Sequence, residues 1–205
     1  MPLSMVLHLR VEARALDHLP EGAELITEFI SPEREFELLG RIDEAAWMLD
    51  LKRRVQHYGW RYDYRARRVG PQAKLGPLPD WLTLEGGTLC DRGFFDQEPD
   101  QIIINEYMPG QGISPHIDCI PCFGPVAASL TLGGGTQMQF DHPASAEQTH
   151  AFLEPRSLLV LTGPARFEWR HGIPARKTDW VEGRRLPRNR RVSLTYRNVT
   201  AVLEG

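Results

Sequence analysis

From Gln101 onward the sequence consists of short apolar runs separated by turn residues, and this pattern constrains the fold more than any other feature. Each run has strand length and is rich in β-branched and aromatic residues. The runs cover residues 101–108, 126–132, 136–140, 157–161, 167–171 and 191–198. Many short strands in one chain are typical of a β-sandwich or barrel. We therefore expect a double-sheet β-core, with the glycine triplet 133–135 as a hairpin turn within it.

Helices are expected in the first half of the chain. Ser31 is a typical N-cap, Pro32 suits the first helical position, and apolar residues follow at helical spacing in EREFELLGRIDEA. A second helix is expected near residues 79–81, interrupted by Gly86-Gly87. The sequence thus predicts a mainly β (α+β) fold in which N-terminal helices pack on the β-core.

Length and composition favour a single domain. The 205 residues are 41% hydrophobic and contain no internal repeat or low-complexity linker, so we expect one domain over 1–205. Residues 1–100 would form the N-terminal helical layer and 101–200 the β-core. The apolar runs are too short to span a bilayer, and the N-terminus lacks a signal pattern. Three cysteines are an odd, sparse set for a secreted scaffold. We expect a cytoplasmic protein with reduced thiols and no membrane partner, a monomer being favoured.

The charge is distributed unevenly, although the net charge is only −3. Residues 1–50 carry eleven acidic and four basic residues, whereas residues 52–74 carry eight basic residues and one acidic residue. A second basic cluster spans residues 176–191. The basic segments are either ordinary solvated surface or a binding surface for a phosphate-bearing partner.

The stretch SPHIDCIPC contains two rival metal-binding pairs. In an extended segment His116 and Asp118 point to the same side, and a second histidine would complete a two-histidine, one-carboxylate iron(II) site with three open positions. Candidates for that histidine are His142, His150 and His171. We favour His171, which closes the strand-like run RFEWRH before a glycine.

The rival pair is Cys119 and Cys122. A four-ligand zinc site would need two further thiols or histidines, and Cys90 is the only other thiol. A redox motif would require a thioredoxin-like strand-to-helix setting. We interpret both cysteines as residues without a functional role, whose thiols a nearby reactive iron centre could oxidise.

Two further groups of residues indicate a ligand. Arg191 and Arg197 lie six apart in one predicted strand and face the same way, as do Asn105 and Tyr107 in another. If they face inward rather than solvent, the arginines require an anion such as a dicarboxylate.

Aromatic residues alternate along another segment. Aromatic side chains occupy every second position, and arginines lie at positions of the opposite parity: Tyr58, Trp60, Tyr62 and Tyr64 against Arg61 and Arg65. In a strand they would form an aromatic face for stacking bases and a basic face for phosphates. The alternative is that the rings simply pack against the N-terminal helix.

The motifs NEYMPGQGISPHID, WRHGI and RVSLTYR, in this order, resemble the AlkB-like iron(II)- and 2-oxoglutarate-dependent dioxygenases. RRVQHYGWRYDY and LPDW extend the resemblance to most of the chain. It is closest to the tRNA-modifying AlkB-homologue branch, which hydroxylates a wobble-uridine side chain. The resemblance implies a double-stranded β-helix (jelly-roll) core, with Fe(II), 2-oxoglutarate and dioxygen as cofactor and co-substrates.

The resemblance also implies roles for individual residues. His116, Asp118 and His171 would hold the iron and carry the catalysis. 2-Oxoglutarate would be bound by Asn105, Tyr107, Arg191 and Arg197, with Arg191 pairing with its distal carboxylate. Ser193 stands where the family often has asparagine, so one co-substrate hydrogen bond differs. Trp60, Arg61 and Tyr62 are candidate substrate contacts.

The implied reaction is oxidation of a C–H bond in a DNA or RNA base, as in DNA repair or tRNA modification. Oxidation of an N-methyl group releases formaldehyde and demethylates the base, whereas other carbons stay hydroxylated. Two alternatives remain: a dioxygenase of the same fold acting on a protein side chain or small metabolite, and a binding module without turnover.

Overall fold

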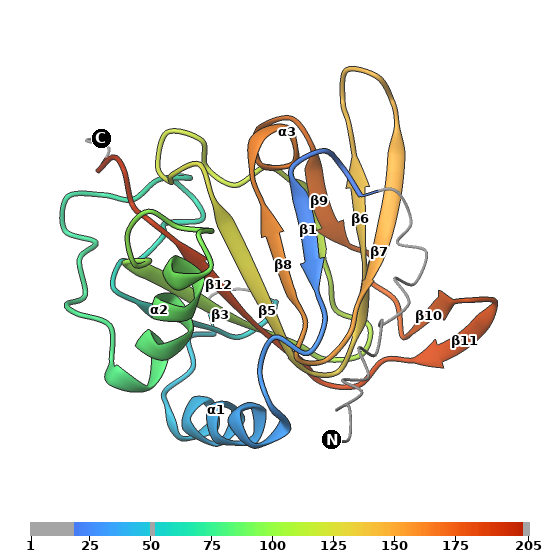
Figure 1. Ribbon diagram of the computed structural model, residues 1–205, viewed down its shortest axis with the longest axis horizontal. Helices are drawn as coiled ribbons and strands as arrows, with labels where there is room; N and C mark the ends of the chain where they lie inside the picture. Colours follow the sequence, from blue (N-terminus) through green and yellow to red (C-terminus); the bar gives the residue numbers. More distant parts are fainter. Residues whose placement is uncertain (1–18, 50–51, 203–205) are drawn as a thin grey trace, which may run out of the picture.

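Two antiparallel β-sheets form the body of the molecule in the computed structural model, which describes residues 19–49 and 52–202 (Figure 1). The larger sheet has six strands in the order β1 (Ala23–Ile26), β8 (Leu158–Leu161), β5 (Ala127–Gly133), β12 (Arg191–Arg197), β3 (Gln101–Tyr107) and β2 (Val55–Tyr58). The smaller has four, in the order β4 (Ile113–His116), β9 (Arg170–Ile173), β6 (Thr136–Asp141) and β7 (Gln148–Leu153). The expected mainly β, jelly-roll architecture is confirmed.

A separate two-stranded ribbon, β10 (Thr178–Val181) and β11 (Arg184–Pro187), projects beside the sheets (Figure 1). A short helix, α3 (Gly163–Phe167), links β8 to β9. Among the described residues, no helix is long and apolar enough to cross a membrane.

The expected helix of the first half is α1 (Pro32–Glu44). Ser31 caps it by accepting a hydrogen bond from the Arg34 backbone nitrogen at 3.2 Å. Leu38 and Ile42 of α1 are buried in an apolar cluster with residues of β3, β5 and β12. The helical layer therefore covers the outer face of the larger sheet.

The second helix does not break at its glycines, contrary to expectation. A 3₁₀ turn, Asp80–Leu82, leads into α2 (Thr83–Asp91), which runs through Gly86 and Gly87. Leu82 and Leu89 are fully buried, and the buried Glu85 pairs with Arg34 of α1, Nε to Oε1 at 2.7 Å. This tertiary packing outweighs the low helix propensity of two glycines.

Three other expectations are corrected. Gly133–Gly135 is not a hairpin turn: it connects β5 to β6, which lie in different sheets. A Cβ at Gly134 would lie 2.8 Å from the Asn189 carbonyl oxygen, so glycine is needed there because two backbones cross closely. Phe167 ends α3 instead of opening a strand. Finally, β1 and β2 place part of the first half of the chain inside the larger sheet.

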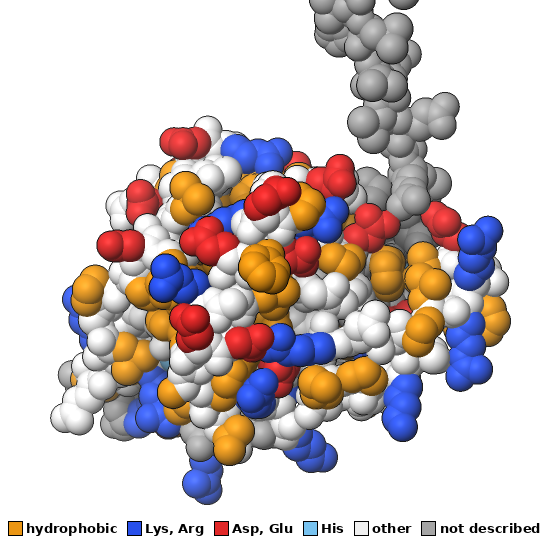
Figure 2. All heavy atoms as spheres, turned by 90° about the horizontal axis from the view of Figure 1, so that it is seen from below, with side chains coloured by type: hydrophobic (Ala, Val, Ile, Leu, Met, Phe, Trp, Pro, Cys, Tyr) orange, Lys and Arg blue, Asp and Glu red, His pale blue; other side chains and the backbone are white. Residues whose placement is uncertain are grey.

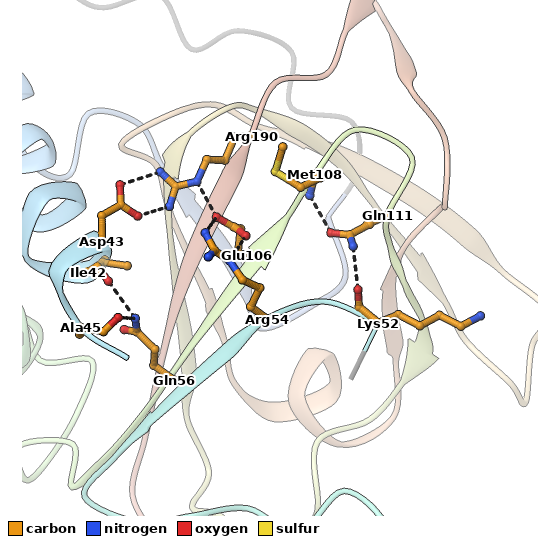
Figure 3. A network of polar contacts seen from close by, with 10 residues as sticks. All are labelled: Ile42, Asp43, Ala45, Lys52, Arg54, Gln56, Glu106, Met108, Gln111 and Arg190. Atoms are coloured by element: carbon orange, nitrogen blue, oxygen red, sulfur yellow. Dashed lines mark hydrogen bonds and ion pairs between the residues drawn. The ribbon is translucent and has the colours of Figure 1, made fainter. Parts of the chain in front are cut away.

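A polar network fixes α1, β2, β3 and β12 relative to one another (Figure 3). The carboxylate of Glu106 on β3 accepts from Arg54 at 2.5 and 2.7 Å and from Arg190 at 2.6 Å. Arg190 also pairs with Asp43 of α1, with one contact at 3.0 Å. The network lies on the helix side of the sheet, because Glu106 has opposite parity to Asn105 and Tyr107.

Alternation along β3 and β12 sets the position of the site. Val192, Leu194 and Tyr196 of β12 join the apolar cluster under the helices. The intervening residues face the space between the sheets, where they line a cavity of about 600 Å³. These residues are Arg191, Ser193, Thr195 and Arg197. The polar faces of the neighbouring strands β3 and β12 thus lie side by side inside a mainly apolar sandwich.

Candidate metal and co-substrate site

His116, Asp118 and His171 converge at the wall of this cavity. Their ligand atoms all lie within 4.8 Å of one another. Asp118 Oδ1 is 3.5 Å from Nε2 of His116 and 4.0 Å from Nε2 of His171. The pairing of β4 with β9 sets His116 directly opposite His171, and the imidazole centroids are 4.5 Å apart. Two histidines and one carboxylate are the donor set of non-haem iron(II) sites.

The protonation states suit metal binding. Burial lowers the pKa of His171 to about 4, so its imidazole is neutral and its lone pair available at neutral pH. Burial alone would raise the pKa of the Asp118 carboxyl, but Arg197 and the two histidines hold it well below its usual range. His116 Nδ1 lies 2.9 Å from the Ser114 carbonyl oxygen, which can only accept. The Nδ1 proton therefore points there, and Nε2 is left to coordinate.

The other two candidate histidines lie elsewhere. His142 and His150 border a separate shallow pocket with Glu168 and Trp169. His142 Nδ1 is 2.8 Å from Ser145 Oγ, and its ring packs on Trp169 with centroids 5.1 Å apart. The structure brings only His171 of the three next to His116 and Asp118.

Arg191 is a buried cation in the same cavity. It is 2% exposed and donates from NH2 to Thr131 Oγ1 at 2.9 Å, while its Nε has no hydrogen-bond partner. Its guanidinium lies 5.5 Å from the centroid of the Tyr107 ring, and burial lowers its pKa to about 10. Within residues 19–49 and 52–202 no carboxylate pairs with it. A buried guanidinium in this state fits an anionic ligand.

Arg197 and Asn105, also expected to bind the co-substrate, line the same cavity but already have hydrogen-bond partners. Arg197 donates from NH1 to Asp118 Oδ2 at 3.0 Å and from Nε to Gln101 Oε1 at 3.0 Å. It therefore orients the candidate metal ligand directly. The Asn105 side-chain oxygen accepts from Arg53 Nε at 2.9 Å. Arg53 also lines the cavity, so it joins the candidate co-substrate residues, although the sequence pattern did not indicate it.

The aromatic segment is not the continuous strand that its alternation predicts. β2 ends at Tyr58, whose ring packs edge-on against Trp81 in the core. The chain then forms a loop over the cavity, and Tyr62 and Tyr64 line it with ring centroids 5.2 Å apart. Trp60 and Arg61 lie outside the cavity lining. Trp60 donates to Asp100 Oδ2 at 3.3 Å and packs under Lys74.

Arg166 of α3 supports the metal-ligand loop from beneath. It is 2% exposed and donates to the carbonyl oxygens of Asp118 at 3.1 Å and Phe123 at 3.5 Å. The sequence offered no signal for this role, because Arg166 is distant along the chain and lies in a helix that was not predicted. Thr131 could have been found, since Ser129 and Thr131 alternate with leucines in a strand.

Cys119 and Cys122 form a disulfide in the structure, which corrects the expectation of reduced thiols. Their Cα atoms are 5.3 Å apart. Cys122 is fully buried beside Val69 and Phe123, and Cys119 lines the cavity directly after Asp118. Cys90 is a free thiol.

Comparison with known proteins agrees with this geometry. The model of the 2OG-Fe(II) oxygenase superfamily matches residues 24–197. The chain is 38% identical over 184 residues to uncharacterized protein L905 of Acanthamoeba polyphaga mimivirus, covering 87% of this chain and 85% of that one. It is 38% identical over 185 residues to the tRNA (carboxymethyluridine(34)-5-O)-methyltransferase alkbh8 of Xenopus tropicalis, covering 88% of this chain but 29% of the frog protein.

The solved structure of OsALKBH1 superposes with a TM-score of 0.65 at 17% identity, covering 89% of this chain and 99% of that one. The likeness at this identity concerns the fold. It places the two-sheet core described above among those of AlkB-like oxygenases.

Proposed function

The chain belongs to the 2OG-Fe(II) oxygenase superfamily, and from this premise we propose that it oxidises a modified or alkylated base in a nucleic acid, by demethylation or hydroxylation. Enzymes of this class use iron(II) as cofactor and 2-oxoglutarate and dioxygen as co-substrates. The proposal assigns His116, Asp118 and His171 to the iron, and Asn105, Tyr107, Arg191 and Arg197 to 2-oxoglutarate.

The observation that carries the co-substrate assignment is the Arg191 guanidinium, buried without a carboxylate partner in the described chain. A dicarboxylate bound in the cavity would supply the missing anion, and its other end would reach toward the metal ligands. Thr131, which already holds one Arg191 nitrogen, keeps the guanidinium oriented. Bound iron and 2-oxoglutarate supply, with dioxygen, the oxidant for a C–H bond.

The protein's own residues orient and shield this chemistry. Arg197 holds Asp118 by one carboxylate oxygen and leaves the other facing the two histidines. Met138, Leu159 and Leu161 line the cavity with apolar surface that restricts water. The Ser114 carbonyl fixes the His116 tautomer.

The cavity mouth supports a nucleotide substrate. Tyr62 and Tyr64 offer two rings to a base, and Lys52, Arg53 and Arg67 bring cationic side chains to the same cavity. Tyr64 and Arg67 thus join Tyr62 as proposed contacts in place of Trp60 and Arg61. The name of the frog relative makes a tRNA uridine the first substrate to test. A cytoplasmic location is part of the proposal.

The decisive experiment is mass spectrometry of nucleosides from tRNA and DNA after incubation with iron(II), 2-oxoglutarate and ascorbate. We expect loss or gain of one modified nucleoside, coupled to succinate formation. If tRNA and DNA stay unchanged while a peptide or metabolite is oxidised, the nucleic-acid proposal fails and the enzyme class stands.

The iron assignment has a separate test. Anaerobic addition of iron(II) and 2-oxoglutarate should give a weak visible charge-transfer band. We expect the band to vanish in His171→Ala and to persist in His150→Ala, a matched control on β7. Persistence of the band in His171→Ala would overturn the choice of third ligand.

A further inference from the structure

The β10–β11 ribbon presents a tryptophan and an arginine side by side on an exposed face. In the antiparallel register Trp180 is opposite Arg185 and Thr178 is opposite Pro187. Directly opposed residues share a face of the ribbon. Trp180 is 61% exposed, and Arg185 donates from Nε to Thr178 Oγ1 at 3.2 Å. The indole ring therefore lies beside a cationic side chain, and neither contributes to the core.

The opposite face of the ribbon is fixed to the jelly-roll. The Asp179 carboxylate is 1% exposed and accepts from Arg188 at 2.7 and 2.8 Å. It also accepts from Arg176 at 2.8 Å and from the Gln137 backbone nitrogen of β6 at 3.2 Å. This buried network holds the ribbon rigidly, so the exposed face is presented in a set orientation at little entropic cost on binding.

The ribbon is also basic. Lys177, Arg184 and Arg185 are exposed, against the single exposed acid Glu182 at its turn. Figure 2 shows blue side chains interleaved with orange ones at the end of the molecule where the ribbon projects in Figure 1. A ring for stacking set among cations is the pattern that binds single-stranded nucleic acid.

The base of the ribbon adjoins the rim of the cavity. The Gly110 backbone nitrogen donates to the Arg176 carbonyl at 3.1 Å, and Gly112, two residues on, lines the cavity. Gln111 between them donates to the carbonyl of Lys52 at 2.7 Å, and Lys52 also lines the cavity (Figure 3). The 108–112 loop therefore connects the cavity mouth, where Lys52 lies, to the base of the ribbon, where Lys177 lies against Gly110.

We propose that the Trp180–Arg185 face of the β10–β11 ribbon binds the single strand of the substrate outside the target nucleotide, with Trp180 stacking on a base and Arg185 contacting a phosphate. The inference rests on the proposed function, because it extends the same substrate beyond the cavity. One nucleotide would enter the cavity while its neighbours lie along the rim.

The test is fluorescence anisotropy of a labelled single-stranded RNA of about 15 nucleotides with the full chain. Losing one stacked base and one phosphate contact should weaken binding of the Trp180→Ala/Arg185→Ala variant by tenfold or more, with a salt dependence shallower by about one ion. The charge-transfer band and substrate-free turnover of 2-oxoglutarate should equal those of the wild type. Phe36→Ala/Arg41→Ala removes a matched exposed pair from α1 and should bind RNA normally.

Each outcome decides a different claim. Unchanged RNA binding in the ribbon variant overturns the ribbon proposal and leaves the proposed function intact. Equal loss in the α1 control also overturns it, because the effect would then be general electrostatics. If wild-type protein with a normal charge-transfer band neither binds nor oxidises any oligonucleotide, both the ribbon proposal and the nucleic-acid function fail.

Discussion

Arg191 is deeply buried and its Nε has no hydrogen-bond partner, so burying its charge is unfavourable until an anionic ligand binds. We expect Arg191→Met to leave the apo protein as stable as the wild type or more stable, because an unpaired buried cation opposes folding. The KM for 2-oxoglutarate should rise by about 100-fold, the order of a lost charge-assisted pair. Thermal melts of the apo protein measure the stability, and initial rates of 2-oxoglutarate turnover against its concentration measure the KM.

The matched control for this prediction is Arg190→Met, which removes the neighbouring arginine on the outer face of the sheet. That variant should lower the melting temperature and keep the response to 2-oxoglutarate. An Arg191→Met protein that is still stabilised by 2-oxoglutarate to the wild-type extent would contradict the assignment.

Among individual residues, the sequence predicted which side chains lie together when they are close along the chain, but not when they are distant. Arg191 and Arg197 lie six apart in β12, so strand parity places them on one face. Asp118 lies two residues after His116, just beyond the end of β4, and its carboxylate reaches the same point. Arg53 and Thr131 reach Asn105 and Arg191 through pairings 52 and 60 residues apart along the chain. Nothing local in the sequence specifies these pairings.

Glu106 joins three elements, and its ionisation should control acid stability. Burial alone would raise the pKa of Glu106, but its bonds to Arg54 and Arg190 lower it below the ordinary value. The stabilisation is therefore present above about pH 4.3 and is lost as the pH falls through the folded pKa, because the unfolded chain binds more protons there. Glu106→Gln should cost about 1–3 kcal/mol at pH 7, since both arginines are partly exposed.

Urea unfolding between pH 3 and pH 7 measures this effect. The wild type should lose stability more steeply on acidification than Glu106→Gln, and the two curves should approach each other at low pH. Glu37→Gln, which removes an exposed acid on α1, is the control and should follow the wild type. Parallel curves for wild type and Glu106→Gln would show that the network does not hold the elements together.

The Cys119–Cys122 disulfide closes the loop after Asp118 and gives a prediction for that element. Thiol titration in denaturant should find one thiol without reductant, Cys90, and three with it. For so short a loop the chain-entropy account gives about 2 kcal/mol of stabilisation, which Cys119→Ser/Cys122→Ser should lose and Cys90→Ser should keep. Three thiols in the absence of reductant would contradict the disulfide.

The elements that the sequence predicted correctly are those whose signals are local. Ser31-Pro32 and the apolar spacing after it predict α1, and short runs rich in β-branched and aromatic residues predict β3 and β12. The continuity of α2 through two glycines depends on Glu85 meeting Arg34 of another helix. The sheet change at Gly133–Gly135 likewise depends on the Asn189–Arg190 backbone crossing close by. Tertiary contacts of this kind cannot be inferred from periodicity.

For the molecule as a whole, the arrangement of charge matters more than its sum. The net charge is −3, yet Lys52, Arg53 and Arg67 line the cavity and the ribbon adds further cations. Acidic residues such as Asp43 and Glu37 lie on α1, on the outer side of the larger sheet. An anionic strand therefore meets a basic surface on a protein that is acidic overall.

This separation of charge predicts the salt dependence of substrate binding. Each phosphate contact to a single strand contributes a slope of about −0.7 to the plot of log K against log salt, so contacts at the mouth and the ribbon should give about −2 to −3. Anisotropy titrations of the single-stranded RNA between about 50 and 300 mM salt measure this slope. A matched uncharged-backbone oligonucleotide should bind weakly and without a slope. A flat plot for the RNA would mean that the basic segments are ordinary solvated surface, the alternative that composition left open, and that base stacking alone holds the substrate.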